Sequence, residues 1–514
     1  MIAVFHTSAT PTELLLDAVR CQRAARYTDA ERLYWMVLTQ HPDDARPARL
    51  YGMLLLSMDR ALEAVPVLRK AVDLEPAHAG ARLHLGRALL AVGQPDAALV
   101  EIHAASVLDP GQVEAAFLRG TALAALRKPA LAVAAFSECL ARHPDHAAAH
   151  LNLGNCYVDM DRLVDAEYFC RRAVSLDPGL AEAHASLGFL FTSLGRLDEA
   201  IAACQAAIRL RPEFAQAHWN LAVAALLSGD FTVGFREYEW RKRHDRFNSD
   251  FVRLPGLEWD GSELGSHTLL VRAEQGAGDT IQFARYLPII AASGTKVVLA
   301  CNRVLTPLLS TLPGVIAADK DQPLPDFDFW VDQMSLPLIC GTRPDTIPLA
   351  EGYLCACAER QAAWRKVLPV GHKVGVAWAG NPLHANDRHR SLSIAALRYL
   401  LATPQIAFIN LQIGPRASEG RLASLPLPLT DYAETAALIA NLDLVVTVDT
   451  SVAHLAGALG VPCWIMLPFA PDWRWQLGRE DSPWYLSARL FRQPSSGDWD
   501  AVVREVRDRL VALH

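Results

Sequence analysis

The chain has 514 residues, a length that suggests about three or four domains at roughly 100–200 residues per domain. Hydrophobic residues make up 51% of the sequence and charged residues 20%, which excludes a disordered chain and a small disulfide-stapled protein. The formal net charge of −7 provides no overall basic field, so we expect neither nucleic acid nor an anionic membrane as a partner.

The ten cysteines are scattered along the chain and form no CxxC pair, a usage that favours a reducing compartment. The N-terminal residues lack the basic region and apolar stretch of a signal peptide. No uncharged apolar run approaches the ~20 residues that span a bilayer. We therefore expect a soluble, cytoplasmic protein without a membrane span.

A period of 34 residues dominates the first half of the sequence. Prolines occur at positions 42, 76, 110, 144, 178 and 212. Glycines at 52, 86, 120, 154 and 188 and alanines at 30, 64, 98, 132, 166 and 200 follow the same step. Because proline ends helices and small residues let two helices approach closely, we predict a stack of helical hairpins.

This pattern resembles the tetratricopeptide repeat (TPR). Six repeats cover about residues 11–214, and an altered seventh unit completes a predicted solenoid over residues 1–246. Such solenoids present a concave groove to extended peptides. Asn152, Asn155 and Asn220 are candidate acceptor-binding residues, because a ladder of amide groups would hydrogen-bond a peptide backbone. The alternative is that they are polar surface residues without a ligand.

Three histidines, His150, His184 and His218, share the 34-residue step. The step places them about one repeat apart, too far for them to share a metal ion. We therefore predict groove or packing roles for them, and no metal site.

After residue 246 the period stops, and residues 247–267 have the Pro and Gly content of a linker. Short apolar runs then alternate with helical stretches, and we predict strands at 268–273, 296–301, 327–332, 373–380, 406–414, 443–449 and 461–467. Their continuous apolar character predicts two α/β domains, over 268–368 and 369–497, each with a parallel sheet covered by helices. A ligand in the cleft between them would bind beyond the carboxyl ends of the strands.

The segment GAGDTIQFARYLP, residues 276–288, directly follows the first of these strands. Gly278 lies in the tight turn, and Asp279 lies near the start of the next helix. As a helix cap, Asp279 would contribute about 0.5–2 kcal/mol to stability. As a general base, it would face the cleft. The spacing leaves both roles open.

A second segment, residues 443–467, contains a strand that ends at Asp449. Thr450 and Ser451 then open a helix, whose free N–H groups and dipole favour a phosphate group. His454, one turn into this helix, either faces the same ligand or packs against the next strand.

A third segment, residues 378–392, places Asn381, Arg388 and Arg390 in one loop at the end of a strand. It is either a solvated charged loop or a clamp for a diphosphate. The tryptophans of residues 469–485 either stack on a base or sugar or pack between the domains. No Walker A, GxGxxG, HExxH or GxSxG motif occurs, which weighs against an NTPase, a dinucleotide dehydrogenase, a zincin protease and an α/β-hydrolase.

The run GDTIQFARYLP resembles the loop that opens the first domain of heptosyltransferase-like glycosyltransferases, and DLVVTVDTSVAHLAGALGVP resembles their nucleotide-binding strand–turn–helix. Together with the repeats, they resemble bacterial TPR glycosyltransferases, which are similar in architecture to O-linked N-acetylglucosamine transferases and to TPR enzymes that glycosylate flagellin. The resemblance implies a GT-B fold of two Rossmann-like domains, inverting chemistry, and no required metal or other cofactor. It also implies a final helix, residues 498–514, that returns to the first half of this module.

The resemblance also implies roles for particular residues. Asp279 would be the general base, and Arg388 or Arg390 would lie near the leaving phosphate. The remaining candidates for the nucleotide-sugar site are Gly278, Asn381, Asp449, Thr450, Ser451 and His454. Ser451 stands where heptosyltransferases commonly have Gly, so the identity of the donor stays open.

The sequence therefore predicts a glycosyltransferase that transfers a sugar from a nucleotide sugar to Ser or Thr of a protein held in the TPR groove, with flagellin as one such acceptor. The alternative is a TPR interaction scaffold whose α/β half only binds a nucleotide sugar. A nucleotide-sugar epimerase or hydrolase is a third hypothesis, disfavoured because small-molecule chemistry needs no peptide groove.

Overall fold

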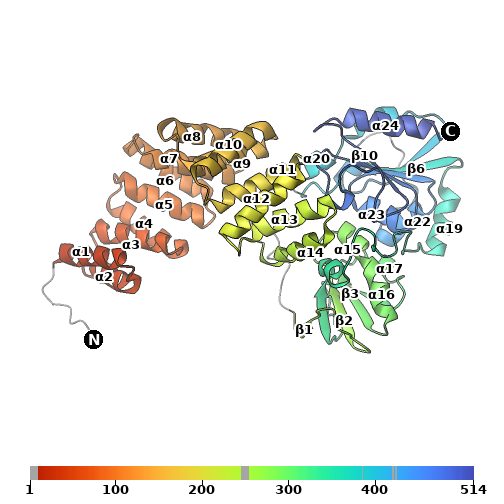
Figure 1. Cartoon of the computed structure of the whole chain (residues 1–514), viewed down its shortest axis with the longest axis horizontal. Coiled ribbons are helices and arrows are strands. Elements are labelled where there is room, and N and C mark those ends of the chain that lie inside the picture. The colour runs from red at the N-terminus through yellow and green to blue at the C-terminus, as the bar shows by residue number, and fades with distance from the viewer. Residues whose placement is uncertain (1–9, 245–253, 385, 420–421, 423–424, 514) are drawn as a thin grey trace. The chain divides into compact units, whose positions relative to one another are not determined.

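A computed structural model of the protein describes residues 10–244, 254–384, 386–419, 422 and 425–513. The chain divides into two compact units, the first ending at Leu190 and the second beginning at Phe191. The first unit consists of helices, and the second combines helices with two sheets (Figure 1).

The first unit is a series of helical hairpins with short turns between their helices. Its helices are α1 (Pro11–Arg23), α2 (Tyr27–Gln40), α3 (Ala45–Ser57), α4 (Ala61–Leu74), α5 (Ala79–Ala91), α6 (Pro95–Leu108), α7 (Val113–Ala125), α8 (Pro129–Arg142), α9 (Ala147–Asp159) and α10 (Leu163–Leu176). Helix α11 (Ala181–Ser193) extends across the boundary between the two units.

Small residues hold the two helices of each hairpin close together, as the sequence predicts. A Cβ added to Gly86 of α5 would lie 2.7 Å from Cγ1 of Ile102 on α6. One added to Gly154 of α9 would lie 2.6 Å from Sγ of Cys170 on α10. Ala98, in the alanine register, is fully buried. The 34-residue period thus reflects helix contacts that leave no room for a larger side chain.

The three recurring histidines have the same structural role in successive repeats. Nε2 of each lies 2.7–3.1 Å from the carbonyl oxygen of the proline six residues earlier: His150 from Pro144, His184 from Pro178, and His218 from Pro212. These contacts support the packing role, because each ring fixes the turn that precedes its helix.

The second unit begins with the end of the helical array, which consists of α12 (Leu197–Leu210), α13 (Ala215–Ser228), α14 (Phe231–Tyr238) and the 3-10 helix η1 (Glu239–Arg243). Two α/β domains follow. Within the described residues each has a five-stranded sheet, with the orders β1-β5-β2-β3-β4 and β10-β9-β8-β6-β7, and all paired strands are parallel. The predicted fold class, a helical solenoid followed by an α/β pair of domains, is confirmed.

The strands are β1 (Leu257–Glu258), β2 (Thr268–Arg272), β3 (Lys296–Cys301), β4 (Val315–Asp319), β5 (Phe329–Asp332), β6 (His372–Ala377), β7 (Ile406–Asn410), β8 (Leu444–Val448), β9 (Cys463–Leu467) and β10 (Ala488–Arg492). The helices are α15 (Ala277–Phe283), α16 (Leu287–Ala292), α17 (Thr306–Leu309), α18 (Leu336–Ile339), α19 (Ala358–Val367), α20 (Asp387–Arg390), α21 (Arg398–Leu401), α22 (Tyr432–Ile439), α23 (Ser451–Ala458) and α24 (Trp499–Val511). The 3-10 helices are η3 (Ala284–Tyr286), η4 (Gln333–Ser335), η5 (Ile394–Leu397), η6 (Pro415–Ser418) and η7 (Trp473–Trp475).

Part of the predicted linker belongs to the first sheet instead. Residues 257–258 pair with residues 329–330 as the edge strand β1, and the neighbouring Trp259 and Leu264 are buried. A two-residue strand is too short to show an apolar pattern, which is why the sequence suggested a linker. Residues 247–253 of that prediction lie outside the described residues.

The other two unpredicted strands, β4 and β10, are also sheet edges. Ile316 of β4 is exposed, and β10 carries Arg489 and Arg492. An edge strand with exposed or charged positions lacks the continuous apolar run by which buried parallel strands are identified.

The prediction for the C-terminal helix is wrong. Helix α24 packs on α21, β10 and β9 of the second α/β domain, and does not return to the first. Its buried residues Val502, Val503, Val506 and Leu510 form one apolar stripe. That stripe completes the cluster around Met466 and Phe491 on its own sheet.

The last helical hairpin packs on the α/β part of the second unit through aromatic side chains. The ring of Phe231 stacks on Trp484 with 5.6 Å between centroids, and Phe235 and Tyr238 meet Trp473 edge-on at 5.8 and 6.2 Å. Such pairs contribute about 0.5–1.5 kcal/mol beyond the area that they bury. The end of the solenoid therefore shares a core with the α/β domains.

A buried ion pair strengthens the same junction. Nη2 of Arg241 donates to Oε1 of Glu274 at 2.9 Å, and both side chains are fully buried. Burial raises the pKa of Glu274 to about 7, although the attraction of Arg241 opposes this shift. Nη2 of Arg241 also donates to Oγ of Ser335 at 2.8 Å, so the arginine joins η1 to two segments of the first α/β domain.

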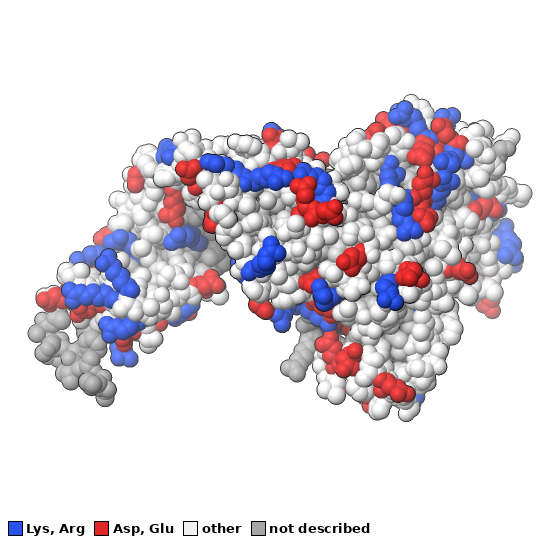
Figure 2. Space-filling model, viewed as in Figure 1, with Lys and Arg blue, Asp and Glu red and all other residues white. Residues whose placement is uncertain are grey.

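Charged side chains of both signs are interspersed on the face shown in Figure 2. Many pair along a helix, such as Arg162 with Asp165 in the first unit and Arg196 with Glu199 in the second, each at 2.7 Å. Among the helices that the structure describes, none combines the length and the apolar character needed to cross a bilayer.

Candidate active site

A cleft of about 970 Å³ lies at the carboxyl ends of the strands of the two α/β domains. Its walls come from the segments that follow β2, β6, β7, β8 and β9. The predicted site residues that line it are Gly278, Asp279, Asn381, Arg390, Asp449, Thr450, Ser451 and His454. The fold thus gathers most of the predicted donor and catalytic residues at one site.

Asp279 caps α15 and also lines the cleft, and its role as the general base stays a prediction. Its Oδ2 accepts a hydrogen bond from the backbone N of Gly276 at 3.0 Å, which caps α15. Its Oδ1 accepts one from Arg474 at 2.5 Å, and the side chain is 25% exposed at the wall of the cleft. A carboxylate has about four lone-pair positions, so this geometry leaves Asp279 able to accept a proton from a bound hydroxyl.

Sequence reasoning missed Arg474, whose guanidinium makes three side-chain hydrogen bonds at the wall of the cleft. Besides Asp279, it donates through Nη1 to Oδ1 of Asp472 at 2.9 Å and through Nε to Oε1 of Gln282 at 2.5 Å. Burial alone would lower the pKa of Arg474, but Asp472 and Asp279 raise it above its ordinary value. The available signal was an arginine enclosed between two tryptophans in the run DWRW.

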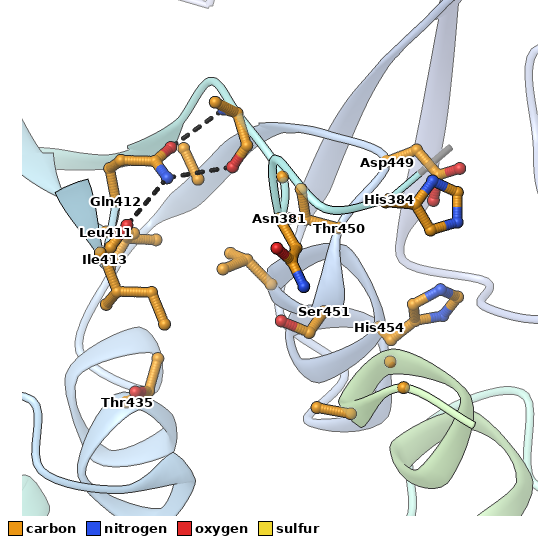
Figure 3. A pocket seen from close by; sticks show the side chains of 18 of the residues that line it. Asn381, His384, Leu411, Gln412, Ile413, Thr435, Asp449, Thr450, Ser451 and His454 are labelled. Carbon is orange, nitrogen blue, oxygen red and sulfur yellow. Dashed lines mark hydrogen bonds between the residues drawn. The ribbon is translucent and has the colours of Figure 1, made fainter. Parts of the chain in front are cut away.

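The turn between β8 and α23 has the features of an anion site. No side chain caps the N-terminus of α23, so its first N–H groups and the helix dipole are available to a negative ligand. Tyr432 Oη donates to Oγ of Ser451 at 2.8 Å, and Oγ1 of Thr450 lies 3.2 Å from that of Thr447. Figure 3 shows Thr450 and Ser451 with their side chains at this wall of the cleft.

His454 lines the cleft as a neutral imidazole. Burial, followed by the positive charge of Arg474, lowers the pKa of His454 to about 3. Its Nδ1 lies 3.0 Å from Oη of Tyr485, and its ring stacks on Trp475. The ring thus packs on Trp475 and also lines the cleft, and its contact with a ligand stays a prediction.

Asp449 is a buried carboxyl group at the end of β8. Burial and the neighbouring Asp472 raise the pKa of Asp449 to about 6, while Arg390 and Arg474 oppose the shift. The effect on Asp472 is opposite in sign: burial raises its pKa, but Arg474 outweighs this and holds the pKa below the ordinary value. The two carboxyl groups therefore differ in charge state between about pH 4 and pH 6, where Asp449 is protonated and Asp472 is ionised, and both are ionised above that range.

Of the two predicted arginines, Arg390 alone lines the cleft. A Cβ on Gly380 would lie 2.7 Å from Nη2 of Arg390, so the guanidinium packs on that backbone. Nε of Arg390 lies 3.8 Å from Oδ1 of Asp387, whose Oδ2 lies 3.4 Å from Nη2 of Arg416. Asp387 thus holds two arginines of the cleft wall, and the second, Arg416, was not predicted.

Arg388 is exposed and does not line the cleft, which corrects the prediction that it belongs to the donor site. Its Nε donates to Nε2 of His389 at 2.8 Å. Side chains two residues apart on a helix are rotated by roughly 200° about the helix axis, so Arg388 and Arg390 leave α20 on nearly opposite sides.

The opposite wall of the cleft is more apolar. Figure 3 shows Leu411, Ile413 and Thr435 across from Asn381 and Ser451. Gln412 lies in the same wall, where its Nε2 donates to the carbonyl oxygens of Ala379 and Ile413 at 3.0 and 3.2 Å. These bonds fix the backbone that forms this wall.

The tryptophans of residues 469–485 pack and do not line the cleft. Trp473, Trp475 and Trp484 are at most 3% exposed. Of the two interpretations that the sequence left open for them, packing between elements is the correct one.

The three predicted acceptor-binding asparagines differ in their exposure. In the first unit, Asn155 of α9 is exposed and Asn152 is half-buried. In the second unit, Asn220 of α13 is buried, and its Oδ1 accepts a hydrogen bond from Nε2 of Gln216 at 2.8 Å. Asn220 therefore stabilises its own helix, and its binding role stays a prediction.

No group of three or more His, Cys, Asp or Glu side chains within the described ranges is placed to hold a metal ion. Independence from metals and other cofactors stays a prediction.

Family comparisons agree with both halves of the sequence. Residues 55–119 and 117–181 match the family described as Tetratricopeptide repeat, and residues 190–229 match the family described as TPR repeat. Residues 419–465, which contain α22, β8 and α23, match Glycosyltransferase family 9 (heptosyltransferase). The predicted combination of TPR repeats with a heptosyltransferase-like segment is thus confirmed.

Protein FlbA of Caulobacter vibrioides is 30% identical over 323 residues, which are 56% of this chain and 54% of FlbA. The chain thus spans about half the length of that curated relative. A thermophilic TPR protein of Thermus thermophilus is 23% identical over 36% of this chain and 100% of its own, with a TM-score of 0.33. A TPR protein of Parabacteroides merdae is 13% identical over 46% and 93%, with a TM-score of 0.40.

Proposed function

We propose that the protein is an inverting glycosyltransferase that moves a sugar from a nucleotide sugar to a Ser or Thr hydroxyl of a protein bound by its repeats. One observation supports this most directly. Asp279 and the 449–454 turn, which come from the two heptosyltransferase-like motifs, line the same cleft from different α/β domains.

Asp279 is the general base of the proposed reaction. Its carboxylate takes the proton of the acceptor hydroxyl as the hydroxyl oxygen bonds to the anomeric carbon. The bond from that carbon to the phosphate oxygen breaks on the opposite side, and the electron pair leaves with the nucleotide. The capping bond from Gly276 and the ion pair with Arg474 fix the carboxylate for this task.

The leaving nucleotide develops negative charge on its phosphate. The N–H groups at the start of α23 and the guanidinium of Arg390 are placed in the cleft wall to stabilise that charge. His454 is neutral, so it contributes a hydrogen bond and no charge. Asn381 and the hydroxyl groups of Thr450 and Ser451 complete the polar half of the cleft (Figure 3).

The helical repeats recruit the acceptor protein in this proposal, with the amides of Asn152 and Asn155 on α9 as its first candidate contacts. The proposal places the protein in the cytoplasm, since all ten cysteines are free thiols. It requires no metal.

The first test is thermal unfolding of the full chain with UDP, GDP, ADP and CMP and their nucleotide sugars, because a bound ligand stabilises the folded state by mass action. We expect one nucleotide series to raise the Tm, and to raise it less in Asp449→Ala. The stabilising nucleotide sugar, labelled in its sugar, is then incubated with candidate acceptor proteins. If no nucleotide of the panel shifts the Tm, the protein is the TPR scaffold.

Asp279→Asn separates binding from chemistry. We expect this variant to bind the nucleotide sugar with near wild-type affinity and to lose protein labelling. Labelling at the wild-type rate in Asp279→Asn would eliminate the assignment of Asp279 as the base.

A further inference from the structure

Two segments of the second unit meet at the guanidinium of Arg474. Arg474 and its partner Asp472 follow β9 of the second α/β domain, whereas Asp279 and Gln282 belong to α15 of the first. All three donor groups of Arg474 are used, and its side chain is 6% exposed. The bonds therefore connect the wall that binds the donor with the carboxylate that faces the acceptor.

We propose that Arg474 is a positioning residue for catalysis, which sets the orientation of the Asp279 carboxylate from the donor-binding domain; this inference rests on the proposed role of Asp279 as the base. Oδ1 of Asp279 is held by Arg474 and Oδ2 by the N–H of Gly276, so the plane of the carboxylate is fixed at both oxygens. A base held in this way presents the same lone pair to every bound acceptor.

The geometry favours positioning over direct contact with the leaving phosphate. Arg474 lies between two carboxylates, Asp279 and Asp472, which satisfy its positive charge. Arg390 differs, because its Nε lies 3.8 Å from Oδ1 of Asp387, beyond hydrogen-bond distance, and Asp387 is shared with Arg416. In this proposal Arg390 stabilises the leaving phosphate, whereas Arg474 positions the carboxylate of Asp279.

The environment of Arg474 extends to the helical array. Its guanidinium carbon lies 4.3 Å from the centroid of the Trp473 ring and 5.7 Å from that of Phe283. Trp473 in turn packs on Tyr238 of α14, whose hydroxyl accepts a hydrogen bond from Nε2 of Gln275 at 3.2 Å. The last repeat thus supports both the arginine and the residue that precedes the Gly276 turn.

The experiment measures protein labelling by Arg474→Met and Arg474→Lys, with Arg489→Met as the matched control. Arg489 lies in the same domain and pairs with Glu480 at 2.8 Å at the surface. We expect Arg474→Met to lower kcat by about 100-fold, the loss that about 1 Å of misplacement causes, with the donor KM changed by less than about threefold. Arg474→Lys keeps one charged contact, so we expect its kcat to be about tenfold higher than that of Arg474→Met.

A double-mutant cycle with Asp279→Asn shows whether Arg474 acts through Asp279. We expect Arg474→Met to change the residual rate of Asp279→Asn by less than about threefold, because the group to be positioned is gone. An equal loss in both backgrounds would overturn the positioning role while leaving Asp279 as the base. Full activity of Asp279→Asn alone would instead overturn the proposed base.

The thermal unfolding midpoint of each variant shows whether that variant is folded. If Arg474→Met does not fold, Arg474→Lys is used alone in the cycle, because it retains the buried positive charge. A folded Arg474→Lys with wild-type kcat, or one with a weakened donor KM and unchanged kcat, would overturn the proposal.

Discussion

Gly278 and His454 are in contact across the two α/β domains: a Cβ on Gly278 would lie 2.8 Å from Cδ2 of His454 and 3.5 Å from Cα of Ser451. Helices α15 and α23 therefore approach each other too closely for a side chain at position 278. This contact joins the helix of the proposed base to the helix of the proposed phosphate site, so glycine is needed at this position for packing.

Gly278→Ala tests this contact. We expect it to lower the free energy of unfolding by about 1–3 kcal/mol, the usual cost of overpacking, and to weaken nucleotide-sugar binding as α23 moves. Denaturant unfolding and titration with the donor measure the two effects. Gly111→Ala is the control, because a Cβ there would meet the carboxylate of Asp109 alone, at 3.2 Å. Equal unfolding free energies for the two variants would show that the close approach does not matter.

Asp449 predicts a specific dependence of stability on pH. Its pKa is raised to about 6 by burial and by Asp472, whereas the ordinary value for an Asp in an unfolded chain is 3.8. Between these values the folded protein binds a proton that the unfolded chain does not, so this group makes the protein more stable as the pH falls from about 6 to 4. Above pH 6 the buried carboxylate is ionised, and its full destabilising effect is present.

Asp449→Asn should therefore be more stable than the wild type at pH 8, and the difference should disappear by about pH 4. Urea unfolding at several pH values between 4 and 8 measures it. A difference that is constant across this range would mean that Asp449 is not the titrating group.

Tyr485 fixes the orientation of His454, which sets the donor that the ring presents to a phosphate. Tyr485→Phe removes the group that lies 3.0 Å from Nδ1 of His454. We expect a loss of about 1–3 kcal/mol in unfolding free energy, because a buried polar atom loses its partner, together with weaker donor binding. Tyr399→Phe is the control, since Tyr399 is 54% exposed. Unchanged donor affinity in Tyr485→Phe would separate His454 from the donor site.

Much of this site could be predicted because its motifs are local in the sequence. Asp279 lies in the first turn of the helix that follows β2, and Asp449 directly follows β8, so the carboxyl-end rule for parallel sheets brings both to the same cleft. Arg474 could not be identified in this way. Its role depends on three partners from two domains, and within its own segment it looks like one charge among aromatic residues.

Burial explains the remaining differences. A polar residue at a repeat register, such as Asn220, carries no sign of whether the next element covers it, and here η1 packs on α13. Arg388 and Arg390 look equivalent in sequence and differ because a short helix separates their directions.

The boundary of the catalytic unit gives the last prediction. A chain that begins at residue 254 lacks α13 and α14, so Trp473 and Trp484 lose the aromatic partners that α14 provides, and Glu274 loses Arg241. We expect this chain to be unfolded, whereas one that begins at Ala181 should retain the donor-induced Tm shift. Arg241→Met in the full chain isolates the ion pair, and breaking a buried pair costs about 3–5 kcal/mol. Circular dichroism melting compares the three proteins. Cooperative unfolding and donor binding by the chain from residue 254 would show that the last repeat only adjoins the α/β domains. If the chain from residue 254 shows neither cooperative unfolding nor donor binding, and the chain from Ala181 shows both, the last repeat is a structural part of the catalytic unit.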